Sequence, residues 1–130
     1  MAFAEIDCDF DIPRTTAQQR RFGSQGNYAG PLLRRAQASW LALARRHAPE
    51  KPMEGAVSLN VSLYYHSARV HDEEYKTTRP DLDNTLKLIQ DALVQAGWLK
   101  DDAAISAIVA EKNLTPGNER VYIFMEEIEE

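Results

Sequence analysis

The chain has 130 residues, of which 44% are hydrophobic and 27% charged, and its formal net charge is −5. These values are typical of one globular domain (1–130), and the single cysteine, Cys8, excludes a scaffold built on internal disulfides. There is neither an apolar run of about 20 residues nor an apolar leader, so we expect a cytoplasmic protein without a membrane span.

Positive charge is concentrated in one segment of this acidic chain. Residues 13–49 contain seven arginines and no Asp or Glu. A local positive field attracts a polyanion such as DNA even when the average charge is negative. Four of the seven arginines fall on a predicted helix, where a merely solvated helix face is an equally good interpretation. These four are Arg34, Arg35, Arg45 and Arg46.

The first half of the chain predicts a strand, a polar segment and a helix. Apolar residues alternate from Ile6 to Ile12, which is typical of a half-buried strand. The segment Pro13–Gly30 is polar and without periodicity, so we expect a loop or a partly ordered arm. A helix then begins at Pro31 and ends before Ala48-Pro49. Its apolar stripe is predicted to consist of Leu32, Ala36, Trp40 (or Ser39) and Leu43.

The second half predicts three strands around one further helix. Apolar residues alternate from Val57 to Tyr65, and the polar stretch from His66 to Thr78 is expected to be a mobile loop. After the second helix, residues 105–112 fit either a strand or a short helix, and their β-branched content and the turn that follows favour a strand. Residues 120–128 have the pattern of a last strand. The order β-α-β-α-β-β predicts an α/β (α+β) domain, with a mixed sheet of about four strands and two main helices.

The second helix is preceded and followed by aspartates. Because Pro80 favours an extended conformation before it, Asp81 and Asp83 are expected to point the same way from the lead-in to the helix. On the helix, the leucine-rich stripe faces the core, and Asp83, Lys87 and Asp91 form the neighbouring polar stripe. The predicted core stripe is Leu82, Leu86, Ile89 and Leu93. Gly97 is placed to end the helix, and Trp98-Leu99 turn the chain back before Asp101-Asp102.

Several carboxylates around one helix favour a hard divalent cation such as Mg²⁺, which prefers oxygen ligands. Taken one at a time, the same residues have ordinary interpretations. Asp81 or Asp83 would serve as a helix N-cap, Lys87 and Asp91 as a surface ion pair, and Asp101-Asp102 as a turn. The spacing does not fix whether Asp101-Asp102 return to the start of the helix.

The run RPDLDNTLKLIQDALVQAGWLKDD, from Arg79 to Asp102, resembles the signature of the RusA-type Holliday junction resolvases, which prophages often encode. The resemblance implies a RusA-like fold and a homodimeric endonuclease that nicks four-way junctions symmetrically in DNA recombination and repair. It implies Mg²⁺ as the cofactor, with Mn²⁺ able to substitute. It makes Asp81, Asp83 and Asp102 the catalytic metal ligands and Lys87 the functional lysine. Asp91 and Asp101 are expected to support them.

Contacts with the DNA phosphates are expected from basic residues outside this run and at its start. These residues are Arg14, Arg20, Arg21, Arg69, Lys76 and Arg79. Two other functions stay open: a non-catalytic module that binds branched DNA, and a Mg²⁺-dependent hydrolase of nucleotides or other small phosphates.

Overall fold

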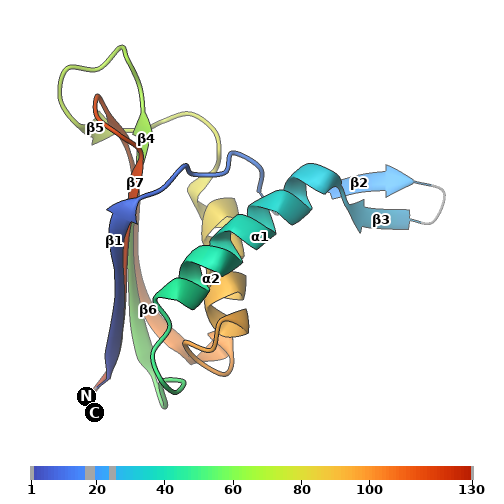
Figure 1. The fold of residues 1–130 in the computed structure, drawn as a ribbon, viewed down its shortest axis with the longest axis vertical. Coiled ribbons are helices and arrows are strands. Elements are labelled where there is room, and N and C mark those ends of the chain that lie inside the picture. Colours follow the sequence, from blue (N-terminus) through green and yellow to red (C-terminus); the bar gives the residue numbers. More distant parts are fainter. Residues whose placement is uncertain (1, 17–19, 24–25, 130) are drawn as a thin grey trace.

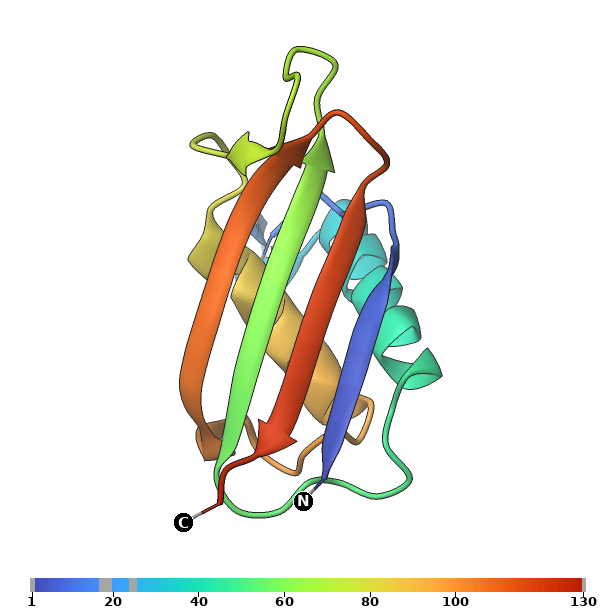
Figure 2. The ribbon, with the colours of Figure 1, turned by 90° about the vertical axis from the view of Figure 1, so that its left-hand side faces the viewer.

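Segments of alternating apolar residues build the frame of the molecule, a mixed sheet of five strands. The computed structural model describes residues 2–16, 20–23 and 26–129. The strands of the sheet are β1 (Phe3–Asp9), β4 (Val57–His66), β5 (Glu74–Tyr75), β6 (Ile105–Thr115) and β7 (Arg120–Glu127). Their order is β1-β7-β4-β6-β5, with β4 and β6 parallel and the other pairs antiparallel (Figure 2). The predicted mixed sheet is confirmed, with one strand more than expected.

Two helices, α1 (Pro31–Arg46) and α2 (Leu82–Gln95), cover one face of this sheet (Figure 1). Every second residue of β4 from Val57 to Tyr65 is buried beneath them, because successive side chains of a strand point to opposite faces. A short 3₁₀ helix, η1 (Asp102–Ala104), leads from α2 into β6. The predicted α+β class is therefore confirmed. Among the described residues, no helix is both long and apolar enough to cross a membrane.

The buried face of α1 differs from the predicted stripe at one position. Leu33 is 1% exposed and belongs to the core, whereas Leu32 is 55% exposed. Both leucines lie within one helical turn of Ala36, so spacing alone did not distinguish them. Trp40 and Leu43 are buried as predicted.

The buried face of α2 is rotated slightly from the predicted stripe. Ile89 and Leu93 are buried as expected, but Leu82 and Leu86 lie at the edge of the core. The buried residues in their place are Thr85, Leu88 and Ala92. A polar residue is buried here because the Thr85 hydroxyl donates a hydrogen bond to the carbonyl oxygen of Asp81, at 3.2 Å.

The strand predicted to reach Ile12 ends at Asp9. Phe10 and Ile12 continue the apolar alternation because both still contact the core after the chain has left the sheet. The ring centroid of Phe10 lies 4.9 Å from that of Trp40, and Ile12 is buried.

The segment expected to be a loop or arm contains a β-hairpin. Strands β2 (Arg20–Gly23) and β3 (Gly26–Ala29) pair antiparallel and project away from the sheet beyond the start of α1 (Figure 1). A hairpin that points away from the core has no need for alternating apolar residues, so the pattern did not reveal it. The loop 66–78 likewise contains a strand, the two-residue β5.

The end of α2 is tied to the end of α1. Gly97 adopts a positive φ of 85°, and the N–H groups of Gly97 and Trp98 donate to the carbonyls of Val94 and Leu93. This is the Schellman arrangement that ends a helix, as the sequence predicts. The indole N–H of the buried Trp98 then donates to the carbonyl oxygen of Ala44 at 2.8 Å.

Replacing Trp98 by Phe should therefore cost more stability than replacing Trp40 by Phe. Both substitutions replace a buried indole by a smaller phenyl ring. Only Trp98→Phe also removes a hydrogen bond, because the Trp40 N–H has no acceptor among the described residues. We expect the loss in free energy of unfolding to be larger for Trp98→Phe by about 1 kcal/mol, the net value of one hydrogen bond. Urea denaturation of both variants would measure the difference, and equal losses would contradict it.

Candidate functional site

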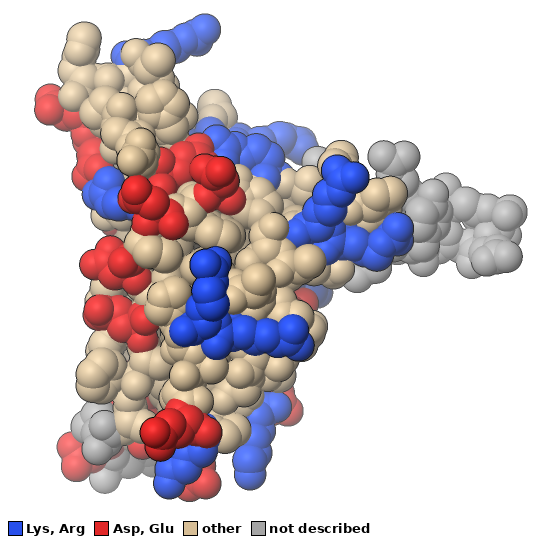
Figure 3. Space-filling view, in the orientation of Figure 1, with Lys and Arg blue, Asp and Glu red and all other residues tan. Residues whose placement is uncertain are grey.

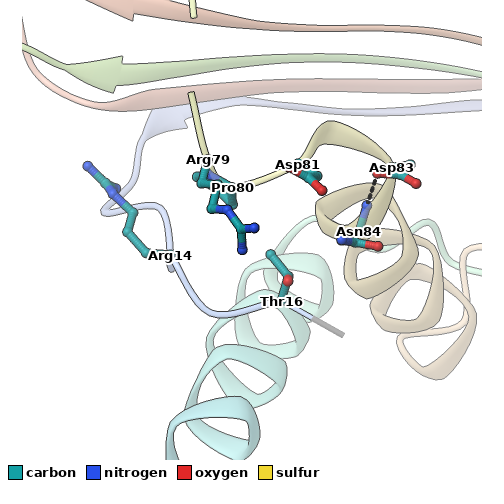
Figure 4. A pocket seen from close by; sticks show the side chains of 7 residues that line it. All are labelled: Arg14, Thr16, Arg79, Pro80, Asp81, Asp83 and Asn84. Atoms are coloured by element: carbon teal, nitrogen blue, oxygen red, sulfur yellow. Dashed lines mark hydrogen bonds between the residues drawn. The ribbon is translucent and has the colours of Figure 1, made fainter. Parts of the chain in front are cut away.

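The start of α2 presents two exposed carboxylates. Asp81 occupies the N-cap position in an extended conformation, but its side chain makes no capping hydrogen bond. Asp83 lies in the first turn, where one of its oxygens accepts the N–H of Asn84 at 3.0 Å. Both side chains are exposed, and Figure 4 shows them close together at the helix start. The ordinary interpretation of Asp81 as a capping side chain therefore has no support.

These carboxylates line a pocket that also contains positive charge. The pocket is formed by Arg14, Thr16, Arg79, Pro80, Asp81, Asp83 and Asn84 (Figure 4). Arg79 is exposed and forms no ion pair with any carboxylate of the described residues. A guanidinium beside exposed carboxylates suits a phosphate group that is bound together with a cation.

Lys112, on β6, fixes the segment that enters the pocket. Its ammonium group donates to the carbonyl oxygens of Thr78 at 2.6 Å and Pro80 at 2.8 Å. These bonds hold the backbone immediately before Asp81 against the sheet. Lys112 was not predicted from the sequence, because a bond from a strand lysine to carbonyl oxygens about 30 residues earlier has no signature in spacing.

Glu119, in the turn between β6 and β7, holds the side chain of Arg14 through hydrogen bonds. Its carboxylate accepts two hydrogen bonds from the Arg14 guanidinium and one each from the backbone N–H groups of Ile12 and His66. The Glu119 side chain is only 12% exposed. Burial alone would raise the pKa of Glu119, but the bonds from Arg14, His66 and Ile12 outweigh it and hold the pKa below its ordinary value. Glu119 was also missed, since it lies about 105 residues from Arg14.

The ring of Tyr65 packs against two cationic side chains, Arg14 and Lys76. Its ring centroid lies 4.8 Å from the Arg14 guanidinium carbon and 5.4 Å from the Lys76 ammonium nitrogen, distances typical of cation–π contacts. Burial raises the pKa of Tyr65 to about 12, so the ring stays neutral. Lys76 also donates to the Thr78 hydroxyl at 2.7 Å. Its pKa is lowered by burial and by the nearby charges of Lys112 and Arg14.

The remaining carboxylates lie at the other end of α2. Asp101 and Asp102 line a separate hollow with Asp91 and Lys100. Asp101 accepts the N–H of Ala103 at 2.9 Å and so caps η1. Since α2 has 14 residues, its length separates Asp102 from Asp81 and Asp83 by roughly 20 Å. No three His, Cys, Asp or Glu side chains of the described chain form a group that could hold a metal.

The other predicted residues fall in different places. Lys87 is exposed on α2, one turn after Asp83 and between the two carboxylate groups. Arg69 is exposed in the loop after β4 and does not line the pocket. The side chains of Arg20 and Arg21 lie outside the described residues, although their backbone belongs to β2.

Comparison with known proteins agrees with the signature around α2. The family model described as "Endodeoxyribonuclease RusA" matches residues 11–126, which include the pocket and both ends of α2. A curated relative, "Crossover junction endodeoxyribonuclease rusA" of Lactococcus phage r1t, is 27% identical over 113 residues. That match covers 83% of this chain and 86% of the relative.

The Glu119 network predicts a specific dependence of stability on pH. A carboxyl whose pKa is lowered on folding stabilises the fold above its ordinary pKa of 4.5, and this contribution disappears as the pH falls through the folded value. At neutral pH, Glu119→Gln should lower the free energy of unfolding by about 1–3 kcal/mol, the cost of breaking charge-assisted bonds. The difference from the wild type should shrink below pH of about 4. A difference that urea denaturation finds constant down to acid pH would contradict this role.

Proposed function

Because the chain belongs to the RusA family of endodeoxyribonucleases, we propose that it resolves Holliday junctions by paired symmetric nicks that require Mg²⁺ or Mn²⁺. The observation that carries the proposal is the pocket at the start of α2. There, the exposed carboxylates of Asp81 and Asp83 share a pocket with Arg79, and Arg14 lies at its far end (Figure 4). This pocket combines ligands for a hard cation with groups that bind phosphate.

The residues of the pocket suit separate tasks. Asp81 and Asp83 would hold the cation, and their oxygen donors fit Mg²⁺. When bound, Mg²⁺ supplies Lewis-acid activation of the phosphodiester and of the attacking water. Arg79 would bind a backbone phosphate through its planar fork of N–H donors. Lys87, on the exposed stripe that begins at Asp83, would hold the scissile phosphate or orient the attacking water.

Asp102 fits this site only if it comes from a second subunit, because α2 separates it from Asp81 and Asp83 within one chain. The outer edge of β6 offers a place for that subunit. β5 pairs only with Asn113 and Leu114, so the earlier part of β6 is an edge of the sheet. Ile108 and Val109 are 44% and 68% exposed there. An exposed apolar edge strand readily pairs with another strand.

Antiparallel pairing of β6 with its copy would bring the two halves of the site together. A two-fold axis between Ile108 and Val109 places Ile105 opposite the partner's Lys112. Lys112 bonds to the carbonyl of Pro80, next to Asp81. The carboxylate of Asp102, just before Ile105, would thus approach the start of the partner's α2. The resulting homodimer has two equivalent sites, as two symmetric nicks require.

The metal assignment predicts that Asp81→Asn, Asp83→Asn and Asp102→Asn each abolish nicking of a synthetic mobile four-way junction in Mg²⁺. We expect a fall of at least about 100-fold, since losing one ligand removes the cation that stabilises charge in the transition state. Binding of the junction should persist in gel-shift assays. Near-normal cleavage by any of the three would overturn its assignment.

The two alternative functions have tests of their own. Turnover of nucleotides in place of junctions would favour a small-phosphate hydrolase. A lack of saturable Mg²⁺ binding in calorimetry would favour a non-catalytic module.

The shared site makes a sharper prediction with two inactive variants. A heterodimer of one Asp81→Asn chain and one Asp102→Asn chain carries both substitutions in one site and leaves the other intact. Coexpression under different tags should therefore restore nicking, with single nicks in place of paired ones.

The matched control pairs Asp81→Asn with Asp83→Asn. Each site of that heterodimer keeps one substitution, so we expect no recovery. If neither mixture recovers activity while both heterodimers form, the site is not shared in this way.

A further inference from the structure

The exposed face of α1 carries only positive charge. The helix contains four arginines and no acidic residue, and all four arginine side chains are exposed. We call this surface the α1 arginine face; it consists of Arg34, Arg35, Arg45 and Arg46. In Figure 3, Lys and Arg side chains gather over α1, whereas Asp and Glu side chains gather along the sheet. The opposite side of α1 is occupied by the core.

The charges of this face are not balanced by acidic residues of the same helix. The first turn of α1 has no acidic residue, and Arg45 and Arg46 lie in the last turn, where the helix dipole favours positive charge. Arg35, Arg45 and Arg46 form no ion pair with any described carboxylate. The exposed guanidinium groups of Arg35, Arg45 and Arg46 therefore remain available to an external anion.

The spacing of the arginines suits a duplex. Arg35 and Arg46 are eleven residues apart, which is three helical turns, so they lie on the same side of α1 about 16 Å apart. The residues between them on that side, Ser39 and Ala42, have small side chains. Flexible arginines at this separation can reach phosphates on both strands beside a groove, which is about 12 Å wide for the major groove of B-DNA.

We propose that the α1 arginine face binds the phosphate backbone of a duplex arm of the DNA substrate, outside the pocket where the strand is nicked. This rests on the proposed function only in taking DNA as the ligand. Such contacts are independent of sequence and release counterions, so they make the affinity depend steeply on salt. The surface therefore adds affinity for the arm and takes no part in the chemical step.

The test compares two variants with the same change in net charge. Arg35→Gln combined with Arg46→Gln removes two charges from the α1 arginine face. Lys51→Glu changes the net charge equally at an exposed position in the loop between α1 and β4. Dissociation constants for a four-way junction and for linear duplex are measured without Mg²⁺ over a series of KCl concentrations.

We expect the double variant to bind both DNAs about tenfold more weakly at about 0.1 M salt. Its slope of log affinity against log salt should fall by about 2, since each phosphate contact contributes about 0.9. Lys51→Glu should keep the wild-type slope. The single-turnover nicking rate at saturating protein should be unchanged in the double variant, and urea denaturation should show that it folds normally. Equal slopes for the two variants would overturn the proposal. Wild-type protein that binds junctions but never nicks them would instead overturn the proposed function and leave this comparison valid.

Discussion

The length of one rigid helix constrains the whole candidate site. α2 has 14 residues, and its ends are fixed by different means: a buried threonine and a lysine from β6 at the start, and a Schellman turn with a buried tryptophan at the end. The two ends of α2 cannot move toward each other without disrupting these hydrogen bonds and the packing of the core. The aspartates before and after the helix therefore stay apart in one chain, which is why the proposed catalytic unit contains two chains.

Charge is distributed by layer in this structure. The face of the sheet turned away from the helices bears many of the acidic residues, and α1 bears four arginines and no acidic residue (Figure 3). A net charge of −5 is thus compatible with DNA as substrate, because a polyanion responds to the local field. The acidic layer would also repel DNA from the outer face and orient the substrate toward the helices.

Much of the fold was predictable because it follows from periodicity. The alternation in β4 and β7 and the glycine that ends α2 depend on local physics, and the structure confirms them. The choice between Leu32 and Leu33 and the hairpin of β2 and β3 were not predictable in this way. Which leucine is buried depends on how far α1 is rotated about its own axis against the sheet. The hairpin projects away from the core, so burial imposes no apolar alternation on its strands.

The candidate site was predictable only in its residue types. The motif identified the aspartates around α2, but the distance between the two ends of the helix is a property of the tertiary structure. Glu119 and Lys112 were missed for the same reason, because each acts on atoms more than 30 positions away in the chain. Contacts of this kind cannot be predicted from the spacing of residues along the sequence.

The open edge of β6 also affects the tendency of the protein to aggregate. A bare apolar strand edge invites indiscriminate association with other unfolded or partly folded chains, and proteins usually blunt such edges with charge or proline. Here the centre of the edge is Ser106-Ala107-Ile108-Val109, with neither. In the proposed dimer, the same pairing that completes the nuclease also hides this aggregation-prone edge. A subunit without its copy would then be both unable to cut DNA and prone to aggregate, so activity and solubility would depend on the same strand pairing.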